Sequence, residues 1–217
     1  MDETAGNERP PAAAHKEFAF VPRIINSVRV RDVVVFAAEE LVRDAHAVIV
    51  TKVPWAEVRV LSDPVSVAEV RSEGPLVLVL DDTSVLLTDV ARIRCNNPDV
   101  IIVLLSFNEQ VHCMPPGVAR QRFPHTAKAD LVFAVNRNDL PPERIISSAV
   151  RAAEDLLNIR KHGRVRRFVF LVVDDEPRWF SQFLPVLYSI IGQRAAVRVT
   201  RTYEETIRFL FDVEGES

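Results

Sequence analysis

The sequence predicts an α/β fold in which five parallel strands alternate with helices on both faces of one sheet. Five short runs that are apolar or alternating carry this prediction, at residues 33–36, 58–61, 76–80, 100–105 and 130–135. Uninterrupted apolar runs of this length are typical of strands buried on both faces. Strands that alternate with helices form a parallel sheet, and the connections between them are right-handed crossovers. A further apolar run at residues 168–173 begins another strand–helix repeat.

Composition limits the classes of function. The chain has 217 residues, 48% of them hydrophobic, which is enough for one or two domains with a buried core. Its formal net charge of −3 leaves no basic excess for gripping nucleic acid. No apolar run approaches the roughly 20 residues that a membrane helix needs. Cys95 and Cys113 show neither metal-ligand spacing nor a disulfide framework, which favours a reducing, cytoplasmic setting.

The first part of the chain gives clear strand signals and weaker helix signals. Residues 1–27 lack the pattern of a signal peptide and are expected to form a flexible tail. The strand at 33–36 is followed by Ala37, Ala38, Glu39 and Glu40, and the two glutamates suit the first turn of a helix. Residues 41–53 fit either a helix or a strand, and the pattern does not decide between them.

Helix signals continue between the later strands. Asp63 is an expected N-cap with Pro64 at the first helical position, which predicts a helix to about Ser72. A second helix is predicted over 86–94, and residues 107–129 are expected to be a long loop with at most one helical turn. A closing helix is predicted over 145–157, followed by a basic, solvated connector.

The stretch from residue 168 to 188 reads FVFLVVDDEPRWFSQFLPVLY. A buried strand ends at Asp174 and Asp175, and after Pro177 apolar residues recur with the spacing of one helix face. Ligands of open α/β sheets bind beyond the carboxyl ends of strands, and paired carboxylates there suit Mg²⁺. The alternative for this acidic pair is a solvated turn. A second strand at 196–200 precedes a capping box formed by Thr202 and Glu205.

The motif LVVDDEP resembles the opening strand of a response-regulator receiver domain, a CheY-like fold. The motif SQFLPVLY is similar to receiver-like segments that precede the pyruvate-binding domain in proteins related to phosphoenolpyruvate synthase and pyruvate phosphate dikinase. The resemblance implies a flavodoxin-like sheet with strand order 2-1-3-4-5. It also implies an acidic pair for Mg²⁺ after the first strand, a phosphoacceptor aspartate after the third, a switch hydroxyl after the fourth and a lysine after the fifth.

Carried onto the first five strands, the resemblance makes Asp81 the phosphoacceptor candidate, with Asp82 close behind, and Ser106 the switch hydroxyl. The acidic pair is missing, because VVVFAAEE has alanines at the corresponding positions. The lysine is missing as well, and Arg137 is an imperfect substitute because its wide fork differs from a compact ammonium. Residues 28–160 are therefore interpreted as a degenerate receiver-like domain.

Residues 161–167 are interpreted as a linker, and residues 168–217 as the N-terminal half of a second, truncated receiver-like domain. This half keeps the candidate Mg²⁺ ligands Asp174 and Asp175 but lacks the later strands. Its first strand, normally central, would have an unpaired edge. The chain is therefore expected to be a fragment of something longer, or the half-unit packs on the first domain or on another subunit as a homodimer.

These features predict a non-catalytic module of phosphorelay signal transduction, a pseudo-receiver that acts by protein–protein contact. The implied partners are a histidine kinase, an output domain or a second copy of the chain. The alternative is the regulatory N-terminal fragment of an enzyme resembling phosphoenolpyruvate synthase, with its chemistry on other segments. A further alternative, a Mg²⁺-dependent phosphotransfer enzyme using Asp174 and Asp175, needs a third acid and a cationic partner in the same pocket.

Overall fold

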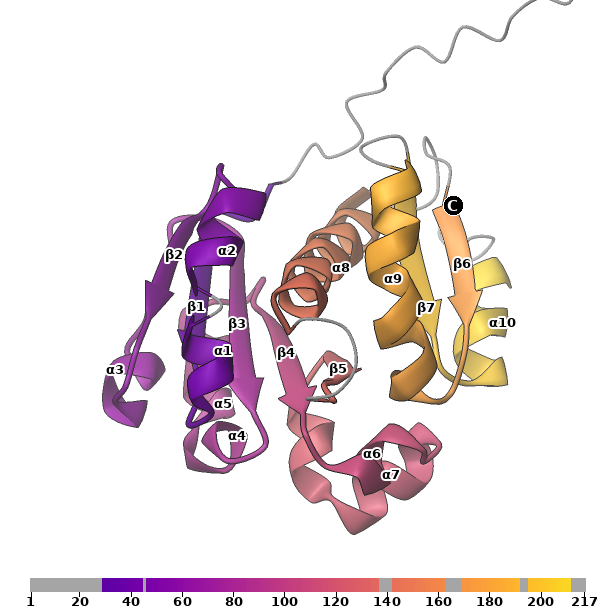
Figure 1. Ribbon diagram of the computed structural model, residues 1–217, viewed down its shortest axis with the longest axis horizontal. Helices are drawn as coiled ribbons and strands as arrows, with labels where there is room; N and C mark the ends of the chain where they lie inside the picture. The colour runs from indigo at the N-terminus through magenta and orange to yellow at the C-terminus, as the bar shows by residue number, and fades with distance from the viewer. Residues whose placement is uncertain (1–28, 45, 137–141, 163–168, 192–194, 212–217) are drawn as a thin grey trace, which may run out of the picture.

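The computed structural model describes residues 29–44, 46–136, 142–162, 169–191 and 195–211, and these contain two parallel sheets (Figure 1). The larger sheet has the strand order β2-β1-β3-β4-β5, which is the order implied by the resemblance to receiver domains. The smaller sheet pairs β6 with β7. The strands are β1 Asp32–Phe36, β2 Glu57–Val60, β3 Leu76–Asp81, β4 Ile101–Ser106, β5 Leu131–Ala134, β6 Val169–Val173 and β7 Ala196–Thr200.

Helices connect successive strands. They are α1 Glu40–Asp44, α2 His46–Lys52, α3 Pro64–Ala68, α4 Ser84–Leu87, α5 Val90–Asn96, α6 Glu109–His112, α7 Pro116–Arg122, the 3₁₀ helix η1 Pro124–Lys128, α8 Pro142–His162, α9 Pro177–Ile191 and α10 Tyr203–Phe211. The segment that fitted either helix or strand contains α1 and α2. Because α8 continues through His162, it includes residues 161 and 162 of the predicted linker, whose remainder lies outside the described residues, as does the predicted tail.

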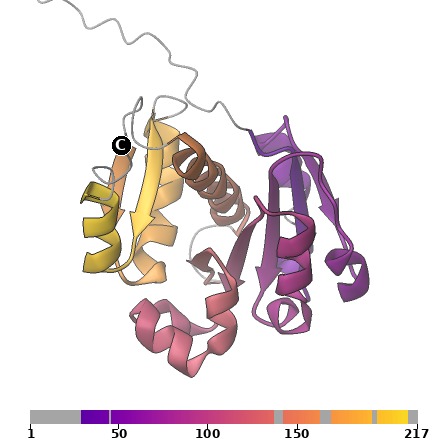
Figure 2. The same ribbon diagram turned by 180° about the vertical axis from the view of Figure 1, so that it is seen from behind.

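Alternate residues of the central strands point to opposite faces, and each face has its own core. Val33, Val35, Val77 and Val79 pack with apolar residues of α2 and α8. Val34 and Leu78 on the other face pack with residues of α3, α4 and α5. Figures 1 and 2 show α1 and α2 on one side of β1 and α4 and α5 on the other. The pleat of the buried strands therefore produces the predicted layering of helices on both faces.

The helix after β2 begins where the sequence predicted and ends earlier. Asp63 accepts hydrogen bonds from the backbone nitrogens of Val65 (3.3 Å) and Ser66 (2.9 Å), so it is the N-cap. Helix α3 ends at Ala68 instead of about Ser72. Asn97 holds the following segment, because its side chain donates to the Val70 carbonyl (2.8 Å) and accepts from the Ser72 amide (2.9 Å). These tertiary hydrogen bonds replace the last helical turns.

Two other element predictions were wrong. The helix predicted over 86–94 is divided into α4 and α5, because the Thr88 hydroxyl donates to the Ser84 carbonyl (2.7 Å) while Asp89 caps α5 through the Arg92 amide (3.0 Å). The expected loop at 107–129 contains α6, α7 and η1. Asn108 caps α6 by accepting from the Gln110 amide (2.9 Å), so a cap residue marked this helix in the sequence.

The segment from β6 to α10 packs against the face of α8 that points away from the larger sheet. Both views show α8 between that sheet and α9. Residues of α9 and β7 belong to the same apolar core as α8 and the larger sheet, and they are Phe180, Leu184, Tyr188, Ile191 and Val197. The rings of Phe133 on β5 and Phe180 meet edge to face at 5.7 Å. The β6–α10 segment therefore packs, within the same chain, on the unit built around the larger sheet.

Two polar contacts fix this docking. The Ser181 hydroxyl accepts a hydrogen bond from the Ala134 amide of β5 (2.9 Å), so α9 covers the end of an edge strand. Asp155 of α8 accepts from the Tyr188 hydroxyl of α9 and from the Val197 amide of β7, both at 2.9 Å. Burial raises the pKa of Asp155 to about 7. One buried carboxyl group therefore joins three elements.

The outer edge of β6 remains open within the described residues, since its ladder partner there is β7. Exposed apolar side chains lie on β6 and on the outer face of α9, namely Phe170, Val173, Trp179, Val186 and Ile190. Among the described residues, none of the helices has both the length and the apolar character needed to cross a bilayer.

Candidate functional site

The carboxyl ends of β1, β3 and β4 meet at one edge of the larger sheet, where the sequence placed the candidate site. Asp81 is the last residue of β3 and is 1% exposed. One of its carboxylate oxygens accepts from the Glu39 amide and the other from the Ser84 amide, both at 2.7 Å. Asp81 therefore ties the segment after β1 to the start of α4, and each of its oxygens already has a backbone donor.

Asp82, the second phosphoacceptor candidate, lies beside the switch-hydroxyl candidate. Its Oδ2 accepts from the Ser106 hydroxyl (3.1 Å) and from the Phe107 amide (2.7 Å). Its Oδ1 is buried without a hydrogen-bond partner and lies 3.5 Å from Nε2 of His125. The structure thus brings Asp82 and Ser106 together and separates both from the inward-facing Asp81.

Two histidines complete this cluster, and no sequence pattern indicated that they would lie there. His112 Nε2 lies 2.6 Å from the carbonyl oxygen of Ser106. Because a carbonyl oxygen only accepts, this ring nitrogen carries the proton. His125 comes from η1, and its ring nitrogen Nε2 lies 3.5 Å from Oδ1 of Asp82. A residue about twenty positions beyond the end of β4 reaches the site because α6, α7 and η1 fold back over it.

Ala37 and Ala38 stand where the resemblance places the acidic pair, and their backbone groups are hydrogen-bonded within the chain. The Ala38 amide donates to the Ser84 hydroxyl (3.0 Å), and the carbonyls of Ala37 and Ala38 accept from Arg43. Lys128 also fails to replace the expected lysine, because its ammonium donates to the carbonyls of Val85 (3.1 Å) and Thr88 (3.4 Å). Arg137 lies outside the described residues.

The second acidic pair lies at the end of β6, apart from Asp82. Asp174 Oδ1 accepts from the Glu176 amide (2.9 Å), and Asp175 is exposed. A shallow depression there is lined by both acids together with Arg201. The described residues contain no group of three histidine, cysteine, aspartate or glutamate side chains placed to hold a metal. The pair fits Mg²⁺ poorly, because one Asp174 oxygen is already hydrogen-bonded, Asp175 is exposed and the Arg201 guanidinium is nearby. We therefore derive no chemistry through a metal at this pair.

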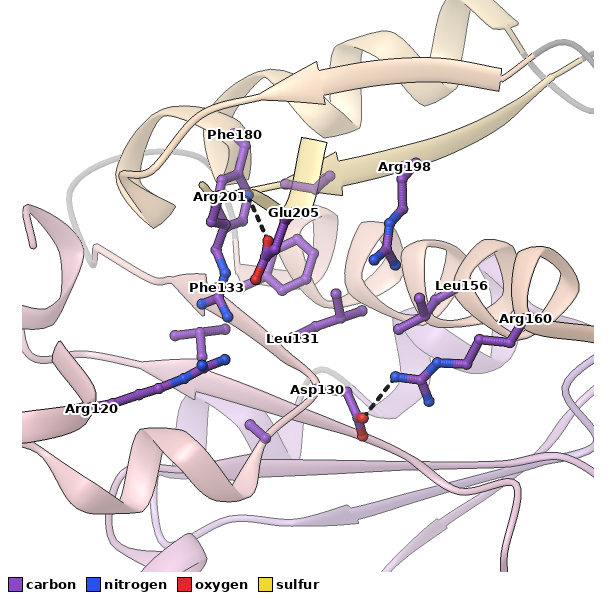
Figure 3. A pocket seen from close by; sticks show the side chains of 13 residues that line it. Arg120, Asp130, Leu131, Phe133, Leu156, Arg160, Phe180, Arg198, Arg201 and Glu205 are labelled. Atoms are coloured by element: carbon purple, nitrogen blue, oxygen red, sulfur yellow. Dashed lines mark hydrogen bonds and ion pairs between the residues drawn. The ribbon is translucent and has the colours of Figure 1, made fainter. Parts of the chain in front are cut away.

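Arginines that sequence reasoning missed gather between the two sheets. Figure 3 shows Arg120, Arg160, Arg198 and Arg201 around one cavity, with Asp130 and Glu205. Arg198 and Arg201 lie at the end of β7 in the sequence RVTR, where nothing distinguishes them from solvated strand residues. The other charged residues of the cavity, such as Arg120, Asp130 and Arg160, lie far away in the sequence, so residue spacing did not indicate the cluster.

No family model, no curated protein and no solved structure matches the chain.

Proposed function

We propose that the chain is a pseudo-receiver, a signalling module that acts through protein–protein contact without transferring phosphoryl groups itself. Two observations support the proposal: the strand order is that of flavodoxin-like folds, and β6, α9, β7 and α10 alternate strand and helix, as a second, incomplete receiver-like unit would. The partners proposed for it are a histidine kinase, an output domain or a second copy of the chain.

The observation that carries this proposal is the chemistry around the acceptor position. A receiver needs Mg²⁺ to neutralise the incoming phosphoryl group, and this role requires acids after the first strand. Ala37 and Ala38 supply methyl groups there, and Asp81 is held by two amides. Asp82 has one buried oxygen without a donor, and the basic side chain beside that oxygen is the imidazole of His125. A carboxylate in this setting lacks the charge that would stabilise an acyl phosphate.

A phosphorylation assay tests the proposal. The purified chain is incubated with acetyl phosphate and Mg²⁺, and its intact mass is measured beside an active receiver run under the same conditions. We expect no phosphoryl increment on this chain. Stoichiometric labelling that disappears in Asp82→Asn, or in Asp81→Asn, would overturn the proposal and identify the acceptor. Labelling that persists in both variants would have to be on another residue and would leave the pseudo-receiver interpretation of these aspartates standing.

The open edge of β6 supports a second candidate, the regulatory N-terminal segment of an enzyme resembling phosphoenolpyruvate synthase. In a longer chain, a third strand would pair with β6 and cover the exposed Phe170. The test is the reading frame. Continuation past Ser217 into strands followed by an ATP-binding segment supports this candidate, and a stop codon after Ser217 opposes it.

A further inference from the structure

A cavity of about 230 Å³ lies where the β6–α10 segment meets the larger sheet. Its walls come from α7, β5, α8, α9, β7 and α10, so residues distant in sequence surround it (Figure 3). Four arginines and two acids supply its charges, and the apolar walls include Leu131, Phe133, Leu156 and Phe180. The cavity exists only when the β6–α10 segment is docked, because its two sides belong to different sheets.

The acids of the cavity are already occupied. Asp130 accepts from Arg160 (3.0 Å), from Arg94 outside the cavity (3.0 Å) and from the Ile102 amide (2.9 Å). Glu205 accepts from the Arg201 backbone amide (2.8 Å), while its own amide donates to the hydroxyl of the N-cap Thr202 (3.1 Å). Positive charge is therefore in excess over the carboxylates that remain to neutralise it.

Three guanidinium groups lack hydrogen-bond acceptors among the described residues, and they are Arg120, Arg198 and Arg201. Nε of Arg198 is fully buried and has no hydrogen-bond partner, and the guanidinium carbon lies 6.0 Å from the centroid of the Phe209 ring. The pKa values of Arg198 and Arg201 are both lowered, and desolvation is the largest cause. The negative charge of Glu205 opposes this shift, and neighbouring arginines add to it. A protein rarely buries guanidinium donors without an acceptor, because each lost hydrogen bond to water is uncompensated. This arrangement indicates that an acceptor is supplied from outside the chain.

We propose that this cavity binds a small organic anion of the phosphomonoester class. Guanidinium forks match phosphate oxygens with paired hydrogen bonds, and three forks from different elements suit a group that presents three oxygens. The apolar side chains opposite suit a short carbon body, and the volume is below that of the sites that hold drug-sized ligands. The proposal goes beyond the signalling function proposed above and does not depend on the chemistry at Asp82.

Binding has a consequence for the structure. Arg120 belongs to the unit built on the larger sheet, whereas Arg198 and Arg201 belong to the β6–α10 segment. A phosphate group held by both sides links them and removes the mutual repulsion of the arginines. The ligand is therefore expected to strengthen docking, because it binds the docked form and not the undocked form.

The experiment uses the whole chain and three probes at low, matched ionic strength. Glycerol 3-phosphate is titrated by calorimetry, with inorganic phosphate and succinate as separate arms and sodium chloride as the ionic-strength control. We expect saturable binding of glycerol 3-phosphate, weaker binding of inorganic phosphate, and none of chloride beyond screening. Saturable binding of succinate with no binding of either phosphate would overturn the assignment to phosphomonoesters.

Variants locate the binding. Arg198→Gln, Arg201→Gln and the exposed Arg120→Gln are each expected to weaken the affinity by about ten- to a hundredfold, as loss of a charged hydrogen bond does. Arg92→Gln is the matched control, because Arg92 is an exposed arginine paired with Glu69 at 3.2 Å away from the cavity. Since Arg120 lies on the surface of α7, its replacement leaves the docked core intact.

Hydrogen exchange provides the second readout. Saturating glycerol 3-phosphate is expected to slow amide exchange across residues 169–211 in the unchanged chain and in Arg92→Gln, and not in Arg120→Gln. The proposal fails if no probe binds saturably in the millimolar range, or if Arg92→Gln weakens binding as much as the cavity variants do. It also fails if all cavity variants keep the original affinity.

Discussion

Asp155 makes docking of the β6–α10 segment dependent on pH. Its carboxyl group is 2% exposed and joins α8 to α9 and β7. Desolvation raises its pKa from 3.8 to about 7, against opposing hydrogen bonds from Val197 and Tyr188 and the nearby charge of Arg151. Tyr188 is shifted in the same direction, since burial and the negative charge of Asp155 raise its pKa well above 10.0. The pair therefore favours a protonated Asp155 beside a neutral tyrosine.

The sign of the effect follows from proton binding. Because the pKa of Asp155 is higher in the folded chain than in the unfolded chain, the folded chain binds this proton more tightly. The free energy of unfolding therefore falls as pH rises from about 4 to about 7, and the loss is complete above that window. A shift of about 3 units corresponds to about 4 kcal/mol in total, of which about 2 to 3 kcal/mol falls between pH 5 and pH 8.

The perturbation is Asp155→Asn, which keeps an oxygen acceptor for Tyr188 and Val197 and cannot ionise. Urea unfolding is followed by circular dichroism at a series of pH values from about 5 to about 8, and the pH dependence is compared with that of the unchanged chain. Glu204→Gln, a change at an exposed acid of α10, is the control for a change of charge alone.

The expected result is that the free energy of unfolding of the unchanged chain falls relative to that of Asp155→Asn as pH rises. The unchanged chain loses about 2 to 3 kcal/mol more than Asp155→Asn between pH 5 and pH 8, and Glu204→Gln follows the unchanged chain. Parallel curves for the unchanged chain and Asp155→Asn would refute the reasoning, as would a gain in stability of the unchanged chain relative to the variant with rising pH. Either result would mean that Asp155 is ionised without penalty in the folded state.

Two further predictions concern the same interface. Phe180→Ala empties a site against Phe133 and is expected to cost about 3 to 5 kcal/mol of docking, measured as faster amide exchange over residues 169–191. Phe183→Ala on the exposed face of α9 is its matched control, and equal effects of the two variants would contradict the packing described. Ser181→Ala leaves the buried Ala134 amide without an acceptor and is expected to cost about 1 to 3 kcal/mol. Unchanged exchange at Ala134 in this variant would mean that water replaces the hydroxyl.

The strands of the larger sheet could be predicted from the sequence because each is buried on both faces. A run such as residues 76–80 has no polar side chain, and only a central strand with helices above and below requires that pattern. The acidic residues after such a run were equally accessible to prediction. Their individual roles could not be predicted, because they depend on contacts with distant segments. Asp81 accepts from two backbone amides, whereas Asp82 contacts Ser106 and His125.

Helix lengths and the arginine cavity could not be predicted because contacts between distant segments determine them. Asn97 ends α3 from the far side of α5, and no local pattern announces this. Asp155 did leave a signal. Residues 152–158 are buried on every side of α8, which happens when a helix has partners on two faces, and an acid within such a stretch implies bonded partners. The predicted helix over 145–157 rested only on the apolar residues of one face, so its second buried face was missed.

The shared core of α8 changes what a domain boundary means in this chain. Cutting between residues 162 and 169 would uncover Phe133 and the outer face of α8 on one fragment, and would leave the other with a two-stranded sheet too small to be stable alone. The first fragment keeps the core between its sheet and α3 to α5, whereas the core on the α8 face is divided between the two fragments. Mixed together, however, they retain every contact that joins them in the intact chain. The two pieces should therefore reassemble by fragment complementation, with the first acting as the template on which the second folds.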